Sequence, residues 1–151
     1  MKKQILSIIA TLTLVVPMSI IGFAGLTTRV KADIPFDFTV GNKEFKAGSY
    51  TVSRLYNTAT SGTLVIRSAD NKAAANFNVN GVLDKGQPSA KLIFHRYGNQ
   101  YFLARIFDGT SNEGGELLKS KAEREAAKKR DIITQNVVEP ETVTVVAQVG
   151  R

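Results

Sequence analysis

The chain of 151 residues contains no cysteine, no tryptophan and a single histidine, His95. Without cysteine there is no disulfide framework and no thiol to carry a lipid, so packing alone must hold the fold together. A metal site is not expected, because one histidine would need carboxylates from distant segments to complete a ligand shell. No Gly-x-Ser-x-Gly elbow accompanies the histidine, so the sequence carries no signature of a nucleophilic hydrolase, and we expect no cofactor.

The charge is not gathered into blocks. The net charge is +7, but the basic residues are spread along the chain apart from the run Lys128, Lys129 and Arg130. A nucleic-acid site needs a basic face with aromatic or helical readers, so we expect no nucleic-acid partner. Three cations at the end of a helix complement its dipole, and contact with anionic lipid or polysaccharide is the alternative. With 43% hydrophobic residues, the chain can bury the core of one domain.

The N-terminus has the pattern of an export signal. Lys2 and Lys3 precede an uncharged apolar run over residues 5–21, and a small-x-small cleavage site ends at Ala24. We therefore expect a signal peptide over 1–24 and an exported protein, either periplasmic, envelope-associated or secreted. Cleavage after Ala32 and an uncleaved membrane anchor are the alternatives, because the run nearly reaches the roughly 20 residues that span a bilayer. If the segment is an uncleaved anchor, it would be the sole membrane contact.

The segment VKADIPFDFTV, residues 30–40, alternates apolar and other residues without a break. This period of two is typical of a strand with one buried face, because successive side chains point to opposite sides. Cleavage after Ala32 would divide the pattern, which favours the site after Ala24. Pro35 lacks an amide donor, which predicts an edge position or a bulge there.

Further strands follow at short intervals. Residues 49–55 and 63–68 alternate in the same way, and a turn at Asp70 and Asn71 predicts that Ile66 faces Ala75 and Leu64 faces Phe77. Two more strands flank a turn at Gly98, and TVTVVAQV (142–149) predicts a last strand or a frayed tail, of which pairing is favoured because a loose β-prone run would aggregate. About seven strands predict an all-β fold, an antiparallel sandwich or a partly closed barrel.

One helix is expected, over residues 116–130, after a polar loop at 108–116. Ser120 and Glu123 have the spacing of a capping box, in which each side chain satisfies an amide near the helix start. The β domain with this late helix would occupy residues 25–130, and 131–151 would be a linker and the possible final strand.

Four stretches in order resemble a group of small exported bacterial proteins without a characterised function. They are IPFDFTVGNKEFKAGSYTV, GTLVIRSAD, KLIFHRYGNQYFLARIF and ELLKSKAEREAAKK, which cover about residues 34–130. The group more often has proline where this chain has Lys46, which bears only on the stiffness of one turn. The resemblance implies an exported β domain and supplies no catalytic or ligand-binding residues.

The stretch around His95 is the most aromatic part of the chain. We interpret His95 as a packed strand histidine beside Ile93 and Phe102, with one ring nitrogen hydrogen-bonded. The turn at Gly98 predicts five cross-strand pairs: Arg96–Tyr101, His95–Phe102, Phe94–Leu103, Ile93–Ala104 and Leu92–Arg105. This pairing places both arginines and the tyrosine on one face.

Arg96, Tyr101 and Arg105 are therefore the candidate ligand-binding residues. Two guanidiniums around an aromatic ring can hold a carboxylate, a sulfate or a sugar acid. The alternative is that both arginines lie over Tyr101 or pair with Glu123 and Glu125 of the helix.

The loop DGTSNEGGE (108–116) contains several oxygen donors but departs from the EF-hand pattern, so a connecting loop is favoured over a calcium site. No paired catalytic groups or metal cluster can be found in the sequence. We therefore expect a non-enzymatic exported β domain that binds an acidic small molecule, a saccharide or an envelope partner. A hydrolase or isomerase using His95 and a structural envelope protein assembling through edge strands are the alternatives.

Overall fold

The described part of the protein is mostly β structure. A computed structural model describes residues 29–55, 62–134 and 139–150, with the backbone alone for 132–134. Within them lie eleven strands and one helix, α1 (Lys121–Thr134). The strands are β1 (Arg29–Ile34), β2 (Phe38–Val40), β3 (Lys43–Phe45), β4 (Gly48–Arg54), β5 (Thr63–Ser68), β6 (Ala74–Leu83), β7 (Ala90–Tyr97), β8 (Gln100–Asp108), β9 (Glu113–Leu117), β10 (Glu141–Val146) and β11 (Gln148–Gly150). The expected signal segment and the cleavage site after Ala24 lie outside the described residues.

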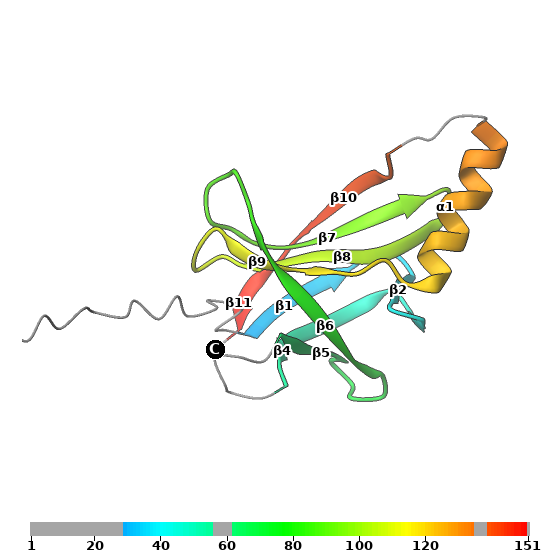
Figure 1. Cartoon of the computed structure of the whole chain (residues 1–151). Helices are drawn as coiled ribbons and strands as arrows, with labels where there is room; N and C mark the ends of the chain where they lie inside the picture. The colour runs from blue at the N-terminus through cyan, green and yellow to red at the C-terminus, as the bar shows by residue number, and fades with distance from the viewer. Residues whose placement is uncertain (1–28, 56–61, 135–138, 151) are drawn as a thin grey trace, which may run out of the picture.

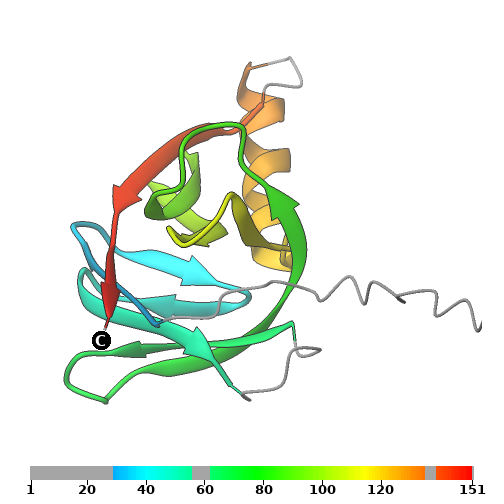
Figure 2. The same cartoon turned by 90° about the vertical axis from the view of Figure 1, so that its left-hand side faces the viewer.

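All the described strands belong to one mixed sheet, which curves back over itself (Figures 1 and 2). Its order is β10-β7-β8-β9-β6-β5-β4-β1-β11, and the β2–β3 hairpin joins it through a parallel contact between Thr39 and Phe102. The two ends of this order, β10 and β11, are consecutive in the chain and separated only by Ala147. The sheet is not closed into a barrel, so of the two expected architectures the all-β sandwich is confirmed.

The first expected strand is interrupted at Pro35. The predicted edge position is not found, because β1 pairs with β4 on one side and with β11 on the other. The alternation holds throughout, since the even-numbered residues from Val30 to Ile34 are buried and Phe38 and Val40 continue the buried face. Pro35 falls in the break between β1 and β2. Because β1 pairs with both β4 and β11, removal of residues up to Ala32 would take away four of the six residues of a strand that has a neighbour on each side.

Six aromatic rings join the two sides of the sandwich. Phe38 makes edge contacts with Tyr50 on β4 and Phe94 on β7, and it stacks on Phe45 of β3. Phe36 stacks on Tyr101 with ring centroids 4.0 Å apart. Aromatic contacts of these kinds add to the free energy of area burial, so the β2–β3 hairpin closes one end of the core.

The β7–β8 hairpin departs from the expected register at a bulge. Arg96–Tyr101, His95–Phe102 and Phe94–Leu103 are paired as predicted. Beyond them the register shifts, so that Ile93 faces Arg105 and Leu92 faces Ile106; the predicted pairs Ile93–Ala104 and Leu92–Arg105 are wrong. Ala104 is the extra residue, and every residue after it on β8 changes face.

The expected polar loop at 108–116 contains strand β9, which pairs with β6 and β8. The prediction of a loop over the whole of residues 108–116 is wrong, because two glycines in this segment allow a strand to pack closely against its neighbours. A Cβ added at Gly114 would lie 2.5 Å from Cδ1 of Phe107, and one at Gly115 would lie 2.7 Å from a methyl carbon of Val79. Only glycine allows β9 to approach both neighbours this closely. Together with β3 in the first turn and the division of the first and last strands, β9 raises the count from seven to eleven.

Helix α1 begins five residues later than predicted, at Lys121, and ends at Thr134 within the expected linker. Residues 116 and 117 belong instead to β9. The predicted pairing of the C-terminal segment is confirmed, because β10 pairs with β7 and β11 with β1. In the part of the chain that the structure describes, no helix is long and apolar enough to cross a membrane.

Candidate ligand-binding site

Arg96 and Tyr101 lie together, as predicted, but intramolecular contacts occupy them. The guanidinium of Arg96 lies 5.5 Å from the centre of the Tyr101 ring, and its Nε donates to the carbonyl of Gly98 at 2.8 Å. A nitrogen of the same group lies 3.4 Å from a carboxylate oxygen of Glu141. The other side of Tyr101 stacks on Phe36. The pair therefore packs the rim of the sheet.

Arg105 does not join them. The bulge at Ala104 places Arg105 on the face opposite Tyr101, where its Nε donates to Glu116 of β9 at 2.7 Å. The prediction that Arg96, Tyr101 and Arg105 share a face is therefore wrong. The expected alternative partners, Glu123 and Glu125, are not the ones found, since the carboxylates come from β9 and β10.

His95 lies under α1, beside a buried carboxylate. Its Nδ1 is 2.7 Å from Oε1 of Glu123, and the hydroxyl of Tyr97 donates to the same oxygen at 3.2 Å. Glu123 is only 4% exposed, so these contacts replace the water that a carboxylate would otherwise bind. One half of the predicted capping box is present, because the amide of Glu123 donates to Oγ of Ser120 at 3.1 Å. The expected return bond is not, because the carboxylate turns toward His95.

Tyr97 is the titratable group most affected by this environment. Its burial, followed by the charge of Glu123 and the bond to it, raises the pKa of Tyr97 to about 12. The guanidinium of Arg130 lies 5.0 Å from the ring centre and acts in the opposite direction. Tyr97 therefore remains a neutral donor at physiological pH.

The oxygen-rich segment after β8 uses its donors and acceptors internally. Asp108 accepts bonds from the amide and the hydroxyl of Thr110, and Ser111 accepts one from the amide of Glu113. Among the residues that the structure describes, no group of three or more His, Cys, Asp or Glu side chains could hold a metal ion.

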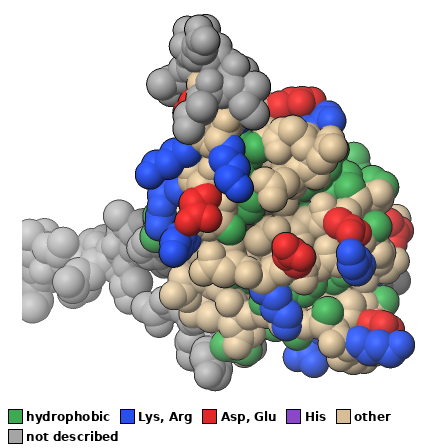
Figure 3. Space-filling view, turned by 90° about the vertical axis from the view of Figure 1, so that its right-hand side faces the viewer, with side chains coloured by type: hydrophobic (Ala, Val, Ile, Leu, Met, Phe, Trp, Pro, Cys, Tyr) green, Lys and Arg blue, Asp and Glu red, His purple; other side chains and the backbone are tan. Residues whose placement is uncertain are grey.

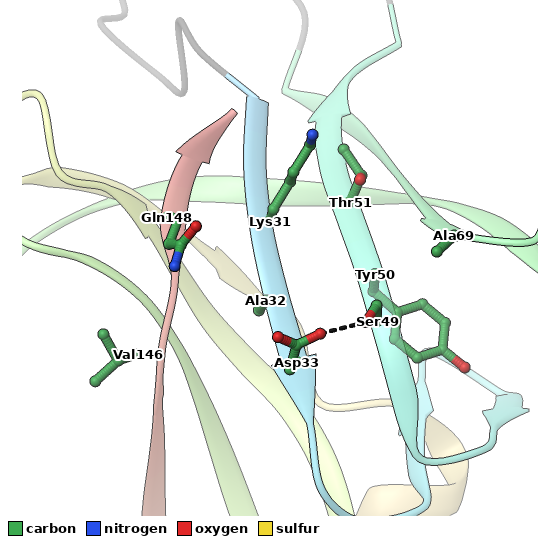
Figure 4. Close-up of a pocket in the computed structure, with 9 residues that line it drawn as sticks. All are labelled: Lys31, Ala32, Asp33, Ser49, Tyr50, Thr51, Ala69, Val146 and Gln148. Atoms are coloured by element: carbon green, nitrogen blue, oxygen red, sulfur yellow. Dashed lines mark hydrogen bonds between the residues drawn. The ribbon is translucent and has the colours of Figure 1, made fainter. Parts of the chain in front are cut away.

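The outward face of β1, β4 and β5 carries two adjoining hollows, of about 440 and 430 Å³, which share Thr51 and Ala69. Figure 4 shows the first, between β4 and the C-terminal strands. Its lining consists of Lys31, Ala32, Asp33, Ser49, Tyr50, Thr51, Ala69, Val146 and Gln148. The second is lined by Arg29, Thr51, Ser53, Val65, Arg67, Ser68, Ala69 and Asn71. We call the two together the outer groove.

Strand register places two cations on either side of a hydroxyl in this groove. Lys31 pairs with Thr51, and Thr51 pairs with Arg67, so the three form one row across β1, β4 and β5. Directly paired residues on adjacent strands are about 4.5–5.5 Å apart, so both flexible cations can reach a group seated over Thr51. Gln148 extends the row on β11.

The charge of the groove is unbalanced. No described carboxylate forms an ion pair with Arg29, Lys31 or Arg67. Asp33 is the single acid among the described residues of the lining, and it accepts a hydrogen bond from Ser49. Three cations against one carboxylate leave a positive surface rich in hydroxyl and amide groups.

The sequence contained part of this signal. Alternation in β1 and β5 places Lys31 and Arg67 on the outward side, opposite Val30 and Ile66. The row itself depends on β1, β4 and β5 being neighbours in one register, and the sequence did not predict that order.

Compared with protein-family models, with curated proteins and with solved structures, the chain gives no match. The resemblance to small exported bacterial proteins therefore stays a prediction.

Proposed function

We propose that the chain is an exported, non-enzymatic β protein that binds an acidic small molecule, such as a sugar acid, in the outer groove. The observation that carries this proposal is the row of Lys31, Thr51 and Arg67, in which two cations that pair with no described carboxylate lie beside a hydroxyl. A guanidinium offers two parallel donors to a carboxylate or sulfate, and a lysine adds a mobile point charge. Arg29 supplies a third cation in the adjoining hollow.

The chemistry of the lining favours recognition by charge and hydrogen bonds. Tyr50 is the one aromatic residue in the lining of either hollow, and its side chain is buried with its hydroxyl donating to the carbonyl of Lys46 at 2.7 Å. Among the described residues of the lining, no ring is therefore presented for stacking against a sugar face. The hydroxyl of Ser53 and the amide of Gln148 are suited to the hydroxyl groups that surround the acid of a uronic sugar.

Calorimetric titration of the full chain with glucuronate and with glucose tests this function. We expect binding of glucuronate, none of glucose, and a loss of at least about tenfold in affinity for Arg67→Ala, since a charge-assisted hydrogen bond contributes about 1.5–3 kcal/mol. Arg105→Ala is the matched control, because that guanidinium already has a carboxylate partner. Equal losses in both variants, or equal binding of both sugars, would contradict the proposal.

The position of β1 bears on where an export signal would be cleaved. The strand starts at Arg29, so cleavage after Ala24 would leave the whole sheet in the mature protein. Cleavage after Ala32 would remove the buried Val30 and one side of the groove. The intact mass of the protein isolated from the expressing cell distinguishes the two sites, and a mature N-terminus at residue 33 would contradict the groove as well.

A second candidate function is acid–base catalysis by His95 in a hydrolase or isomerase. It is favoured by the contact with Glu123, because a carboxylate at Nδ1 fixes the tautomer and orientation of a catalytic imidazole. His95→Ala separates the candidates. If His95 is catalytic, the variant should lose turnover of an ester or of an isomerisable substrate. If His95 only packs, the variant should bind glucuronate unchanged and have a lower free energy of unfolding.

A further inference from the structure

The outward side of α1 carries a stripe of cations. Lys121, Arg124 and Lys128 recur at intervals of three and four residues, which places them on one side of a helix, and Lys129 lies next to this stripe. Lys119 precedes the helix, and all five side chains are exposed. Figure 3 shows lysine and arginine side chains gathered on the face of the molecule where α1 lies.

The opposite side of the same helix is buried. Glu123 and Ala126 face the sheet, where Ala126 packs with Tyr97 and Phe102. At 100° per residue, the cationic stripe is centred opposite these buried positions, so it points directly away from the protein. A plane laid against this side of α1 would touch the cations before any strand.

Little negative charge offsets this stripe. Glu125 is the exposed carboxylate within it, 4.0 Å from the Nζ of Lys121. No described carboxylate lies within ion-pair distance of Lys119, Lys128 or Lys129. The helix dipole does not explain five cations against one carboxylate, because its effect is confined to the last turn, where α1 has no basic residue; the predicted dipole complement by Lys128, Lys129 and Arg130 is therefore wrong.

An exposed apolar residue adjoins the cations. Leu118 is 77% exposed and directly precedes Lys119. A soluble polyanion gains nothing from a leucine, whereas a bilayer interface accepts its side chain among the headgroups and acyl chains while the lysines remain at the phosphates.

We propose that this cationic helix face, formed by Leu118, Lys119, Lys121, Arg124, Lys128 and Lys129, docks on the anionic headgroups of a lipid surface. Each lysine or arginine close to such a surface strengthens binding roughly fivefold. Helix α1 and β11 lie at opposite ends of the molecule in Figure 1, so the outer groove stays open to solvent when the helix is docked. The docking does not depend on what the groove binds.

Vesicle co-sedimentation of the full chain tests the docking. We expect tighter binding to phosphatidylglycerol vesicles than to phosphatidylcholine vesicles, and a loss of at least about tenfold on phosphatidylglycerol for the double variant Lys128→Glu, Lys129→Glu. The matched control is Lys72→Glu, Lys85→Glu, which changes the net charge equally at exposed positions in the turn after β5 and the loop after β6. The N-terminal apolar run is common to all variants, so it cancels in this comparison.

Three results would overturn the proposal. The first is an equal loss in both double variants, which would reduce the effect to net charge. The second is equal binding to the two kinds of vesicle. The third combines two observations: a soluble sulfated polysaccharide binds with the same dependence on Lys128 and Lys129, and Leu118→Ser leaves vesicle binding unchanged. Together they would assign the surface to a polysaccharide. Unchanged circular dichroism of the variants, expected for exposed side chains, establishes that each remains folded.

Discussion

The β7–β8 hairpin and the outer groove both carry basic side chains on a strand surface, but they use them in opposite ways. On the hairpin, Arg96 lies beside Glu141, Arg105 binds Glu116, and His95 contacts Glu123. In the groove, Lys31 and Arg67 form no ion pair with a described carboxylate. An arginine therefore indicates a binding site only when the fold leaves its charge unmatched, and strand register decides this.

Glu123→Ala should give the largest loss of stability. Its carboxylate is the acceptor for Tyr97 and His95 beneath α1, and its removal leaves buried polar groups without an acceptor. We expect the free energy of unfolding to fall by about 2–4 kcal/mol, measured by urea denaturation. Glu125→Ala, on the exposed side of the same helix, should change it by less than about 0.5 kcal/mol. Similar losses in both variants would show that the cluster under α1 contributes no more than the surface.

A second effect should be seen at high pH. The pKa of Tyr97, about 12 in the folded protein, lies above the ordinary value of 10.0 because burial and Glu123 disfavour the phenolate. Between these values the folded state keeps a proton that the unfolded state has released, so stability is complete below pH 10 and falls as pH rises toward 12. The loss is on the order of 2 kcal/mol.

Urea midpoints measured at pH 9 and pH 11 check this prediction, with Tyr97→Phe as the variant that lacks the phenol. The decrease should be smaller in the variant, because deprotonation of the other groups is common to both proteins. If the decrease has the same size in the two proteins, the environment of Tyr97 is not what the structure indicates.

Arg105→Ala should have a smaller effect. The Arg105–Glu116 pair joins β8 to β9, but both side chains are about two-fifths exposed and therefore partly screened by solvent. We expect a loss of about 0.5–1 kcal/mol in urea denaturation. A double-mutant cycle with Glu116→Ala isolates the pair, and a coupling energy near zero would mean that the bulge positions Arg105 without help from the ion pair.

These effects mark the limit of what the sequence could predict. The period of two identified most of the strands between Val30 and Leu103 and their buried sides, and the Gly98 turn predicted the pairs up to Phe94–Leu103. It could not predict the bulge at Ala104, because one inserted residue leaves the pattern apolar on both faces. The prediction of the face on which Arg105 lies was wrong for that reason alone.

The same limit applies to β9 and to the groove. Gly114 and Gly115 are equally suited to a loop and to a strand that must approach its neighbours closely, and only the positions of Phe107 and Val79 distinguish the two. The row of Lys31, Thr51 and Arg67 requires three strands in a fixed order, which local patterns do not contain.

The smallest effect on stability should come from the groove, and its sign sharpens the contrast with Arg105. Arg67 has no carboxylate partner among the described residues. Thr51 lies between Arg67 and Lys31 in the row, so two like charges face each other across a hydroxyl. Arg67→Ala should therefore leave the free energy of unfolding within about 0.5 kcal/mol of the original, or raise it slightly, and the difference should shrink in high salt because screening removes the repulsion. Thermal melts in about 0.02 M and about 0.5 M sodium chloride measure the change in stability and its dependence on salt. A clear loss of stability in Arg67→Ala would mean that this guanidinium helps to hold the fold, and the groove would then resemble the hairpin.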